Sequence, residues 1–317
     1  MKIVFFGTPE FAVTSLDRLV NEGFDIAAVV TMPDKIAGRG HKLIQSDVKK
    51  YALEKGIRVL QPEKLRDEEF LTQLRDINAD LFIVIAFRMM PEVVWGMPPK
   101  GTFNLHGSLL PKYRGAAPIN RAIMNGETET GVTTFMLNHE IDMGDIIEQR
   151  RIEIGDDENV GDIYDRLMHL GADMVVETVR KIENGTLQTQ SQPAGEFIPA
   201  PKIFKADCRI DWRRPARDIR NQIRGLSPYP AAFCTMTDSQ GRDSDMKVFE
   251  AALTEDGGRL QPGEIAVCGK KMIVGTGEGN LEIRSLQPSG KKRMETQAFL
   301  LGYHPDRMKL TETEEDK

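Results

Sequence analysis

The sequence predicts an α/β protein with a second, all-β domain, and three observations lead to this prediction. Short apolar runs alternate with helix-like segments through the first half of the 317-residue chain. Residues 81–86 are apolar throughout, as expected for a parallel strand that is covered on both faces. After residue 206, short strand-like runs alternate with glycine-rich turns. We therefore expect a Rossmann-like, doubly wound, mostly parallel sheet, followed by a small C-terminal β-barrel of the OB-like type.

The first domain, predicted over residues 1–187, opens with a strand, a turn and a helix. Residues 2–6 form a short apolar run, and Gly7 then turns the chain. Thr8 is placed to cap a helix, which Pro9 and Glu10 favour at its first positions. Further strands are expected at 25–31, 58–60 and 81–86, and further helices at 46–55 and 67–76. In such sheets, ligands bind beyond the carboxyl ends of the strands.

The character of the sequence changes after residue 185. Residues 188–205 are rich in Gln, Pro and Ala and lack helical periodicity, so they are predicted to form an extended linker. The β-barrel domain is predicted over residues 206–311, and the acidic residues 312–317 are predicted to be a tail. Within the barrel domain we expect a helix at 215–224 and strands at 231–237, 247–253, 263–268, 272–276 and 280–286.

Composition is that of an ordinary globular protein. The chain is 40% hydrophobic and 28% charged, which suffices for a substantial core. Its three cysteines, Cys208, Cys234 and Cys268, are far apart and lack metal-ligand spacing, so we expect reduced thiols and no metal. The chain opens on a strand and has no apolar run of membrane-spanning length. We therefore expect a cytoplasmic protein, with no signal peptide and no membrane.

A nicotinamide-dependent enzyme is one alternative for such a sheet. A dinucleotide site needs GxGxxG at the first turn, but this turn has the single glycine Gly7. Asp34 follows the second strand, where an acid that binds ribose would lie. Without the glycines, however, a pyrophosphate has no close approach to the backbone, and this class is disfavoured.

Residues 102–118, TFNLHGSLLPKYRGAAP, carry the most informative pattern in the chain. Asn104 and His106 end an apolar strand, and because strand side chains alternate, both are expected on one face. A glycine, an apolar loop and a turn follow, as at the mouth of a small-molecule site. An isolated Asn-x-His is more often a buried pair that satisfies backbone groups, so this pattern alone leaves both interpretations open.

Longer motifs connect this segment to one enzyme family. They are FFGTPEFA, PDKIAGRG, the segment 102–118, ETGVTT, DMGD, RIDW and LQPSGKK. On these motifs the chain resembles the 10-formyltetrahydrofolate-dependent formyltransferases over nearly its whole length. The barrel domain and the AGRG loop resemble in particular the members that formylate initiator methionyl-tRNA for translation initiation. The resemblance implies 10-formyltetrahydrofolate as formyl donor, the methionyl amino group as acceptor, and no obligate protein partner.

Formyl transfer needs a neutral attacking amine, a donor for the tetrahedral oxyanion and a proton route to the leaving nitrogen. The amide of Asn104 can donate to the oxyanion, and a protonated His106 can stabilise that charge and supply a proton. A carboxylate beside the ring would hold its tautomer. The family pattern places this carboxylate at Asp142, where sequence alone would equally allow an exposed turn residue. No Ser or Cys nucleophile is implied, so direct transfer between bound substrates is expected.

The resemblance also implies a folate site. Its predicted residues are Phe87, Arg88, Met89, Ser108, Leu109, Leu110, Pro111, Glu140 and Ile141. The chain departs from the family at two of these segments. AFRM stands where Ala-Tyr-Gly is usual, and LNHE replaces the usual Met-Asp-x-Gly-Leu. His139, within the second segment, is interpreted as a surface loop residue and not as a catalytic one.

The net charge of −6 argues at first against a nucleic-acid partner, but the local distribution of charge matters more than the sum. Basic residues gather after the second strand, across the linker and the first helix of the barrel domain, and at 291–293. The predicted tRNA-binding residues are Arg39, Lys42, Lys202, Arg209 and Arg217. In the resembled enzymes the loop around Arg39 enters the acceptor stem. Each cluster by itself also fits an ordinary solvated face.

Two rival functions remain at this point. A related folate-dependent formyltransferase would act on a nucleotide amine or a sugar amine, and the barrel domain with the AGRG loop argues against it. A non-catalytic RNA-binding protein would have no use for Asn104, His106 and Asp142 together. Formylation of free small amines would favour the first rival.

Overall fold

The computed structural model describes residues 1–37, 42–193, 197–238, 240–305 and 308–311, and the chain divides into two compact units. The first unit comprises Met1–Pro118, Thr130–Ile152 and Tyr164–Ala200. The second comprises Ile119–Glu129, Glu153–Ile163 and Pro201–Lys317. The units are therefore not simple halves of the sequence, and the segment predicted as a linker is divided between them after Ala200.

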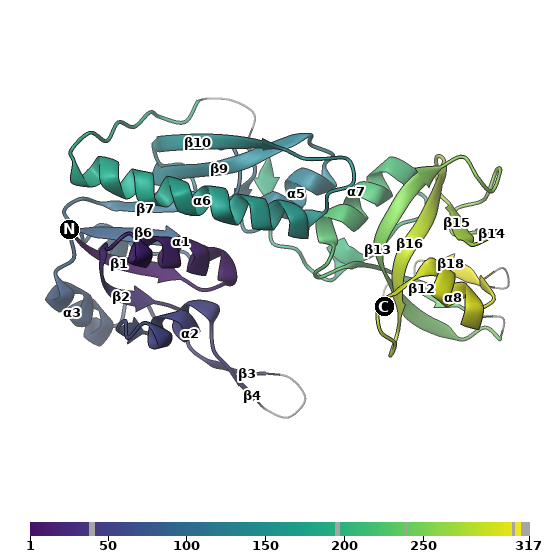
Figure 1. Ribbon diagram of the computed structural model, residues 1–317, viewed down its shortest axis with the longest axis horizontal. Helices are drawn as coiled ribbons and strands as arrows, with labels where there is room; N and C mark the ends of the chain where they lie inside the picture. The colour runs from purple at the N-terminus through teal and green to yellow at the C-terminus, as the bar shows by residue number, and fades with distance from the viewer. Residues whose placement is uncertain (38–41, 194–196, 239, 306–307, 312–317) are drawn as a thin grey trace. The chain divides into compact units, whose positions relative to one another are not determined.

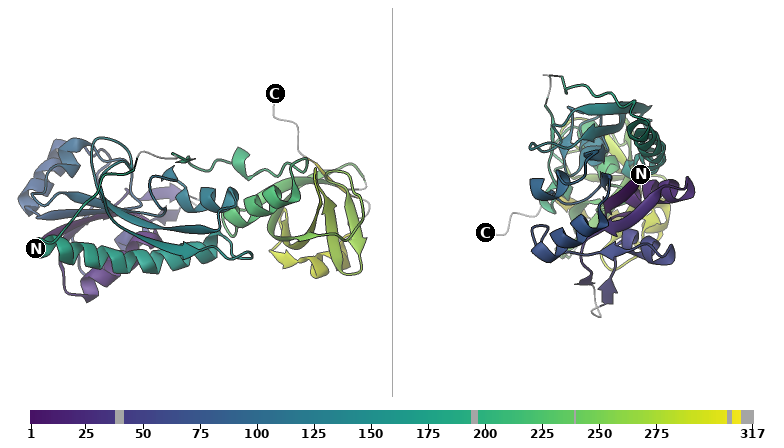
Figure 2. Two further views of the ribbon diagram at one scale, coloured as in Figure 1. Left: turned by 90° about the horizontal axis from the view of Figure 1, so that it is seen from above. Right: turned by 90° about the vertical axis from the view of Figure 1, so that its left-hand side faces the viewer.

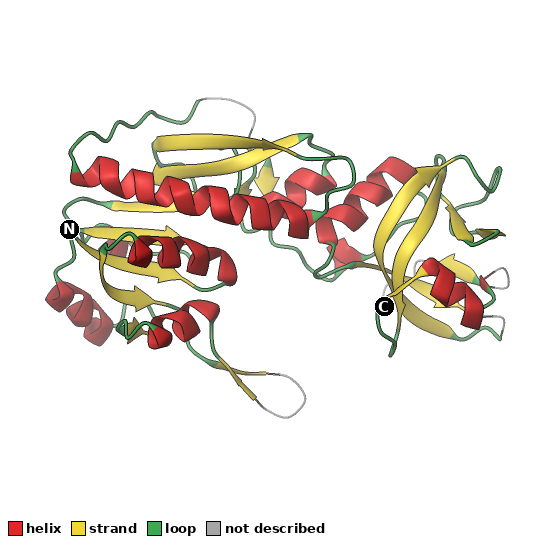
Figure 3. Ribbon diagram, viewed as in Figure 1, coloured by secondary structure: helices red, strands yellow, loops and turns green. Residues whose placement is uncertain are grey.

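The first unit is built on a seven-stranded sheet with the order β10-β9-β7-β6-β1-β2-β5 (Figures 1 and 3). Its strands are β1 (Lys2–Gly7), β2 (Asp25–Val30), β5 (Val59–Leu60), β6 (Leu81–Ile85), β7 (Thr102–His106), β9 (Glu129–Met136) and β10 (Ile146–Glu153). From β5 through β7 all neighbours pair in parallel, whereas β7 and β9 pair antiparallel. The predicted doubly wound, mostly parallel sheet is confirmed.

Helices cover both faces of this sheet. They are α1 (Glu10–Asn21), α2 (Asp47–Glu54), α3 (Glu68–Ile77), α4 (Glu92–Trp95) and α6 (Val160–Glu183). A further helix, α5 (Pro118–Met124), lies mostly in the second unit. Buried residues of α3 and α4 pack with alternate residues of β1, β2 and β6, such as Val4, Phe6 and Phe82. On α1, Phe11 contacts Tyr164 of α6 edge-on and donates its backbone N–H to the tyrosine oxygen. Figure 2 shows α6 running along the sheet.

Side chains cap two of these helices at the residues where the helices were predicted to begin, but the cap predicted for α1 is not formed. Ser46 accepts a hydrogen bond from the backbone of Lys49 at the start of α2, and Asp67 caps α3 in the same way. The predicted cap at Thr8 is wrong. Pro9 is extended (ψ 175°) and precedes the first helical residue, Glu10, so the buried Thr8 hydroxyl is too far back to reach the first turn and has no hydrogen-bond partner.

Two strands outside the sheet, β3 (Lys35–Ala37) and β4 (Lys42–Ile44), pair as an antiparallel hairpin that projects beyond the edge at β2 and β5 (Figures 1 and 2). Its base is held by charged and polar side chains. Asp34 forms an ion pair with Lys49 (2.6 Å) and accepts from Gln61 (2.8 Å). The hydrogen bond from Lys49 is the largest cause of a lowered pKa at Asp34. The chain at the start of the hairpin is therefore held in place by these contacts of Asp34.

The second unit contains the predicted small barrel, which is antiparallel and nearly closed. Its strands are β12 (Ala232–Thr237), β13 (Asp243–Thr254), β14 (Ile265–Cys268), β15 (Lys271–Gly275), β16 (Asn280–Pro288), β17 (Met294–Glu295) and β18 (Lys309–Thr311). They follow the order β14-β15-β16-β13-β12-β18, with β17 beside β16. The backbone N–H of Leu310 in β18 donates to the oxygen of Gly263 just before β14 (3.1 Å), which brings the two ends of the path together.

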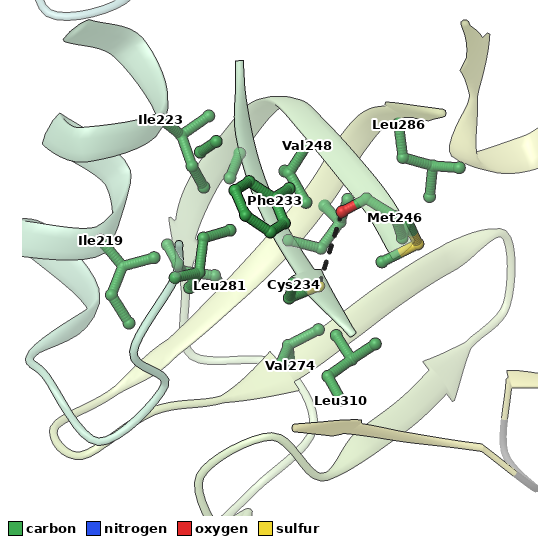
Figure 4. Close-up of a cluster of buried hydrophobic side chains, with 14 of the residues drawn as sticks. Ile219, Ile223, Phe233, Cys234, Met246, Val248, Val274, Leu281, Leu286 and Leu310 are labelled. Carbon is green, nitrogen blue, oxygen red and sulfur yellow. Dashed lines mark hydrogen bonds between the residues drawn. The ribbon is translucent and has the colours of Figure 1, made fainter. Parts of the chain in front are cut away.

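The barrel core extends onto a helix. Ile219 and Ile223 of α7 (Ala216–Leu226) pack with buried residues of β12, β13, β15 and β16 (Figure 4). Leu226 of the same helix belongs to this cluster as well. A second helix, α8 (Thr296–Gly302), contributes the buried Phe299 to the same cluster. The shared core joins α7 to the barrel as one packed unit.

Burial of two cysteines in this unit makes thiol reactivity a direct test of the packing. Burial raises the pKa of the Cys234 thiol to about 12 and also raises that of Cys208, whereas Cys268 is exposed. At pH 8 a disulfide reagent should therefore react rapidly with one thiol of the folded protein, because only thiolates react and the two buried groups are protonated. All three should react in guanidinium. The Cys268→Ser variant should show no rapid reaction, and a second fast thiol would contradict the packing.

Candidate active site

Strand β7 places Asn104 and His106 on one face of the sheet. The intervening Leu105 points to the other face, where it is buried and where Gly171 allows α6 to approach it closely. β7 is also the strand at which parallel pairing with β6 gives way to antiparallel pairing with β9. Asn104 is half-buried, and its amide makes no hydrogen bond to any residue that the structure describes. It is therefore free to bind a ligand.

His106 is buried and held by one nitrogen. Its Nε2 lies 2.9 Å from the carbonyl oxygen of Tyr113. Because a carbonyl can only accept, Nε2 carries the hydrogen, and Nδ1 is the nitrogen that can gain or lose a proton. Nδ1 lies 3.9 Å from Oδ2 of Asp142, with the two side chains 8% and 14% exposed. The structure thus brings together all three residues predicted to be catalytic, with the exchangeable nitrogen facing the carboxylate.

Asp142 is oriented by the backbone. The N–H of Gly115 donates to its Oδ2 (2.9 Å), the same oxygen that faces His106. Asp142 itself has a φ of 53°, a left-handed conformation that is uncommon outside glycine and that aspartate tolerates better than most residues. A functional residue held in such a conformation is a common feature of active sites.

The chain around Asp142 allows little freedom. A Cβ on Gly144 would lie 1.5 Å from the backbone oxygen of Met136, so only glycine fits beside the end of β9. Asp145 closes the turn: its backbone oxygen accepts from the N–H of Met136 (2.9 Å) and its side chain accepts from Ser191 (3.1 Å). Both contacts hold the loop without involving His106 or Asp142.

The loop Ser108–Pro111, predicted to bind folate, follows β7 and is held by hydrogen bonds from β9 and β10. The Ser108 hydroxyl is buried and donates to the oxygen of Lys112 (2.7 Å), so it holds the loop together. Thr133 of β9 donates to the oxygen of Ser108 (2.7 Å) and accepts from the N–H of Leu110 (3.2 Å). Gln149 of β10 donates to both Thr133 and the oxygen of Leu110, each at 2.9 Å.

Thr133→Val should lower the free energy of unfolding by about 1–3 kcal/mol, because it leaves the buried N–H of Leu110 without its acceptor and the oxygen of Ser108 without its donor. Denaturant unfolding of the two proteins measures the difference. Thr133→Ser keeps the hydroxyl and should recover most of the loss. Equal stability of the Val variant and the wild type would show that this hydroxyl does not hold the loop.

The three residues after β6 that were also predicted to bind folate differ in their contacts and exposure. Phe87 packs edge-on against Phe6, and the guanidinium of Arg88 lies 5.7 Å from the Phe87 ring. Arg88 donates to the backbone oxygens of Pro62 and Glu63, and burial lowers its pKa. It therefore braces the chain after β5, whereas Met89 is 74% exposed. A cavity of ≈520 Å³ beside that chain is lined by residues of 59–73 and by none of the predicted site residues.

The remaining residues of the predicted folate site, Glu140 and Ile141, are exposed on the loop before Asp142. His139, on the same loop, is exposed as expected. Its Nδ1 lies 3.5 Å from Glu92, and its ring meets Trp95 edge-on. These contacts keep it away from His106 and Asp142, to which no described contact links it.

The predicted tRNA-binding residues lie on different elements. Arg39 falls outside the described residues, and Lys42 begins β4. In the second unit, Lys202 lies over the exposed ring of Phe204 (5.8 Å), and Arg209 stacks over Phe233 (4.8 Å). Arg217 is exposed on α7. Arginine over an aromatic ring keeps its charge accessible to a polyanion.

Several neighbouring arginines are engaged with acids and contribute less positive field than the sequence suggests. Arg213 pairs with Asp211, Arg214 with Asp218, and Arg220 with Asp157. Arg224 donates to backbone oxygens of the 153–163 segment, and burial lowers its pKa. Among the predicted tRNA-binding residues of this unit, Arg209 and Arg217 have no ion pair with an acid that the structure describes.

Three residues that contact His106 or Asp142 were not predicted as site residues: Tyr113, Gly115 and Gln192. Tyr113 and Gly115 act through backbone groups, for which side-chain type gives no signal. Gln192 lies in the predicted linker of residues 188–205, and no sequence motif surrounds it. Among the described residues, no group of His, Cys, Asp and Glu could hold a metal ion, and no helix is long and apolar enough to span a membrane.

Comparison with known proteins agrees with this geometry. The chain matches the family described as formyl transferase over residues 1–179 and the formyl transferase C-terminal domain over residues 202–304. The fold and the site thus define a two-domain formyl transferase.

Curated relatives narrow the class. The methionyl-tRNA formyltransferase of Bacteroides fragilis is 52% identical over 309 residues, covering 96% of this chain and 95% of that protein. Those of Flavobacterium johnsoniae and Porphyromonas gingivalis are 48% and 47% identical, each over at least 95% of both chains. The chain belongs to the methionyl-tRNA formyltransferase family.

Solved structures share the fold. A sugar 3N-formyl transferase, WlaRD, crystallised with dTDP and 5-N-formyl-THF, has a TM-score of 0.65 at 20% identity, covering 92% of this chain and 99% of that one. HypX from Aquifex aeolicus, in complex with tetrahydrofolic acid, has a TM-score of 0.63 at 20% identity and covers 95% of this chain and 47% of that one.

Proposed function

We propose that this protein transfers the formyl group of 10-formyltetrahydrofolate to the amino group of the methionine carried by initiator methionyl-tRNA. The observation that carries the proposal is the buried pair of His106 and Asp142, beside Asn104 on the same strand. Relatives 47–52% identical over nearly the full length, named methionyl-tRNA formyltransferases, support the choice of acceptor. The proposed substrate is made and used in the cytoplasm, where we expect the protein to act.

The three residues divide the chemistry. Asn104 donates an amide N–H to the formyl oxygen as that oxygen becomes negative, which is when such a bond is strongest. The pair of His106 and Asp142 takes a proton from the attacking amine as the new C–N bond forms. It returns a proton to the folate nitrogen as the old C–N bond breaks, so the transfer is neutral in protons. The products are the formylated amine and tetrahydrofolate.

The positions around the pair support a folate donor. The loop Ser108–Pro111 lies directly after His106 and is fixed by Thr133 and Gln149, so its backbone edge is presented in one conformation. Phe87 and Met89 offer apolar surface after the neighbouring strand β6. We propose these segments, with Glu140 and Ile141, as the donor site. For the acceptor we propose Arg39, Lys42, Lys202, Arg209 and Arg217, which attract phosphates without reading sequence.

Labelled 10-formyltetrahydrofolate, supplied with charged initiator and elongator methionyl-tRNAs, tests the proposal. We expect label on the initiator methionyl-tRNA and much less on the elongator. A panel of free amines and a nucleotide-linked amino sugar serves as the competing acceptor. Efficient formylation of those small amines, with no label on tRNA, would assign the protein to the sugar or nucleotide class instead. Absence of transfer to every acceptor would refute a formyl transferase.

A further inference from the structure

The segment 190–200, between the catalytic residues and the barrel, is bound along its described length to the catalytic loops. Gln190 exchanges two backbone hydrogen bonds with Ile146 of β10 (2.8 and 2.9 Å). Further along, β11 (Pro199–Ala200) pairs in parallel with β8 (Arg114–Gly115). Between these anchors lies Gln192. The segment is therefore part of the first unit's structure and not a free tether.

Gln192 uses all the hydrogen-bonding capacity of its side chain on one loop and one arginine. Its Nε2 donates to the backbone oxygens of Asp142 (2.8 Å) and Gly144 (2.9 Å). Its Oε1 accepts from Nη2 (2.5 Å) and Nε (3.2 Å) of Arg114. An arginine can only donate and a carbonyl can only accept, so the amide has one possible orientation. We call this set of four hydrogen bonds, which joins Gln192 to Arg114, Asp142 and Gly144, the Gln192 clamp.

This clamp and the neighbouring backbone reach both catalytic groups. Gln192 fixes the peptide of Asp142, whose side chain then meets the N–H of Gly115, the residue after Arg114. Separately, the N–H of Tyr113 donates to the oxygen of Ile198 (2.7 Å), and the Tyr113 oxygen accepts from His106. Residues of this segment thus position both groups: Gln192 holds the backbone of Asp142, and Ile198 holds Tyr113, whose oxygen is the acceptor for His106.

We propose that Gln192 is a positioning residue for the reaction, holding Asp142 in its left-handed conformation and at its distance from His106, with Arg114 orienting the amide. The inference rests on the proposed function for its kinetic test. It assigns a catalytic purpose to a segment whose sequence predicts only a connector. Gln192 touches no reacting atom, and its effect passes through Asp142.

Two substitutions separate the halves of the clamp. Gln192→Glu keeps the shape and the contact with Arg114 but replaces both amide donors with an acceptor that faces two backbone oxygens. Gln192→Met keeps the volume and removes both halves. Each should lower kcat by about 10- to 100-fold, because a displacement of about 1 Å at a catalytic group has effects of this size. The KM values for both substrates should stay within about threefold, since Gln192 contacts neither.

Gln190→Glu is the matched control, since the described contacts of Gln190 are made by its backbone. It should behave as wild type. If Gln192→Met is impaired and Gln192→Glu is not, the donors to Asp142 and Gly144 are irrelevant and the proposal is overturned. It is equally overturned if kcat falls only in proportion to lost folded protein, measured by thermal unfolding.

A second readout does not depend on the reaction. The ring-nitrogen NMR signals of His106, assigned by their loss in His106→Ala, report which nitrogen carries hydrogen and what faces the other. Both Gln192 variants should shift the Nδ1 signal, and Gln190→Glu should not. Unshifted signals would refute the positioning role even in an active enzyme. A shift in a protein that formylates no acceptor would leave the positioning role standing and refute the proposed function alone.

Discussion

Asp142→Asn should lower the turnover number at least about 100-fold, and His106→Ala should lower it to the limit of detection, with folate binding retained in both. The asparagine keeps an oxygen for the N–H of Gly115, so the loop is expected to hold its shape. What it loses is the negative charge facing Nδ1 of His106 and the ability to exchange a proton with that ring. Steady-state formylation of methionyl-tRNA and equilibrium binding of a folate analogue measure the two quantities separately.

Neighbouring residues of the same types provide matched controls. Asp145→Asn alters a carboxylate three positions away that faces Ser191, and His139→Ala removes an exposed imidazole that faces Glu92. Both should retain turnover within a few fold. Wild-type-like turnover in Asp142→Asn or His106→Ala would remove that residue from the mechanism. Loss of folate binding with loss of turnover would instead indicate a structural role.

Gly144→Ala should be the most damaging small substitution in the chain's catalytic unit. Its Cβ would stand 1.5 Å from the Met136 oxygen, a backbone atom that cannot rotate away, so β9 and the Asp142 loop must separate. We expect a loss of at least about 2 kcal/mol in the free energy of unfolding, together with a loss of activity larger than the loss of folded protein. Denaturant unfolding and turnover of the soluble fraction give the two values.

Gly302→Ala, at the end of α8, is the comparison, because a Cβ there meets no atom within 4 Å. It should be neutral or slightly stabilising, since alanine favours helices over glycine by about 1 kcal/mol. If Gly144→Ala is equally neutral, the loop can shift by more than the structure indicates, and Asp142 is less firmly placed than its contacts suggest.

Local rules predicted the strands β1, β2, β5 and β6 and the strand that carries the site, whereas β9 and β10 had no counterpart among the predicted elements. Continuous apolar residues predicted β6, and the alternation of side chains placed Asn104 and His106 together on β7. Strands β12 to β16 of the barrel were predicted, whereas β17 and β18 were not. β13 begins at Asp243, earlier than predicted, and the prediction missed this start because Asp243, Ser244 and Asp245 are polar and resemble a loop. They are paired with β12, and such pairing with a partner strand is not visible in local composition.

The parts of the site that sequence did not predict are those made by distant backbone. Asp142 meets Gly115 across 27 positions and Gln192 across 50, and only the folded chain brings them together. No residue type marks a carbonyl as a histidine's acceptor, as at Tyr113. The long helix α6 had no counterpart among the predicted elements, although Gly171 on it permits the approach to β7. These features follow from packing and not from any short pattern.

The contacts that Gln190, Gln192, Ile198 and β11 make within the first unit have a practical consequence for the design of chimeric proteins. In a chimera of this first unit and a foreign barrel, the junction would ordinarily be placed at the start of the predicted linker, near residue 188. Such a chimera would replace Gln192, Ile198 and β11 with residues of the foreign protein. It would therefore remove contacts that position His106 and Asp142, although both residues would be unchanged. A chimera that keeps these contacts must have its junction after Ala200. This is later in the chain than the sequence alone would suggest.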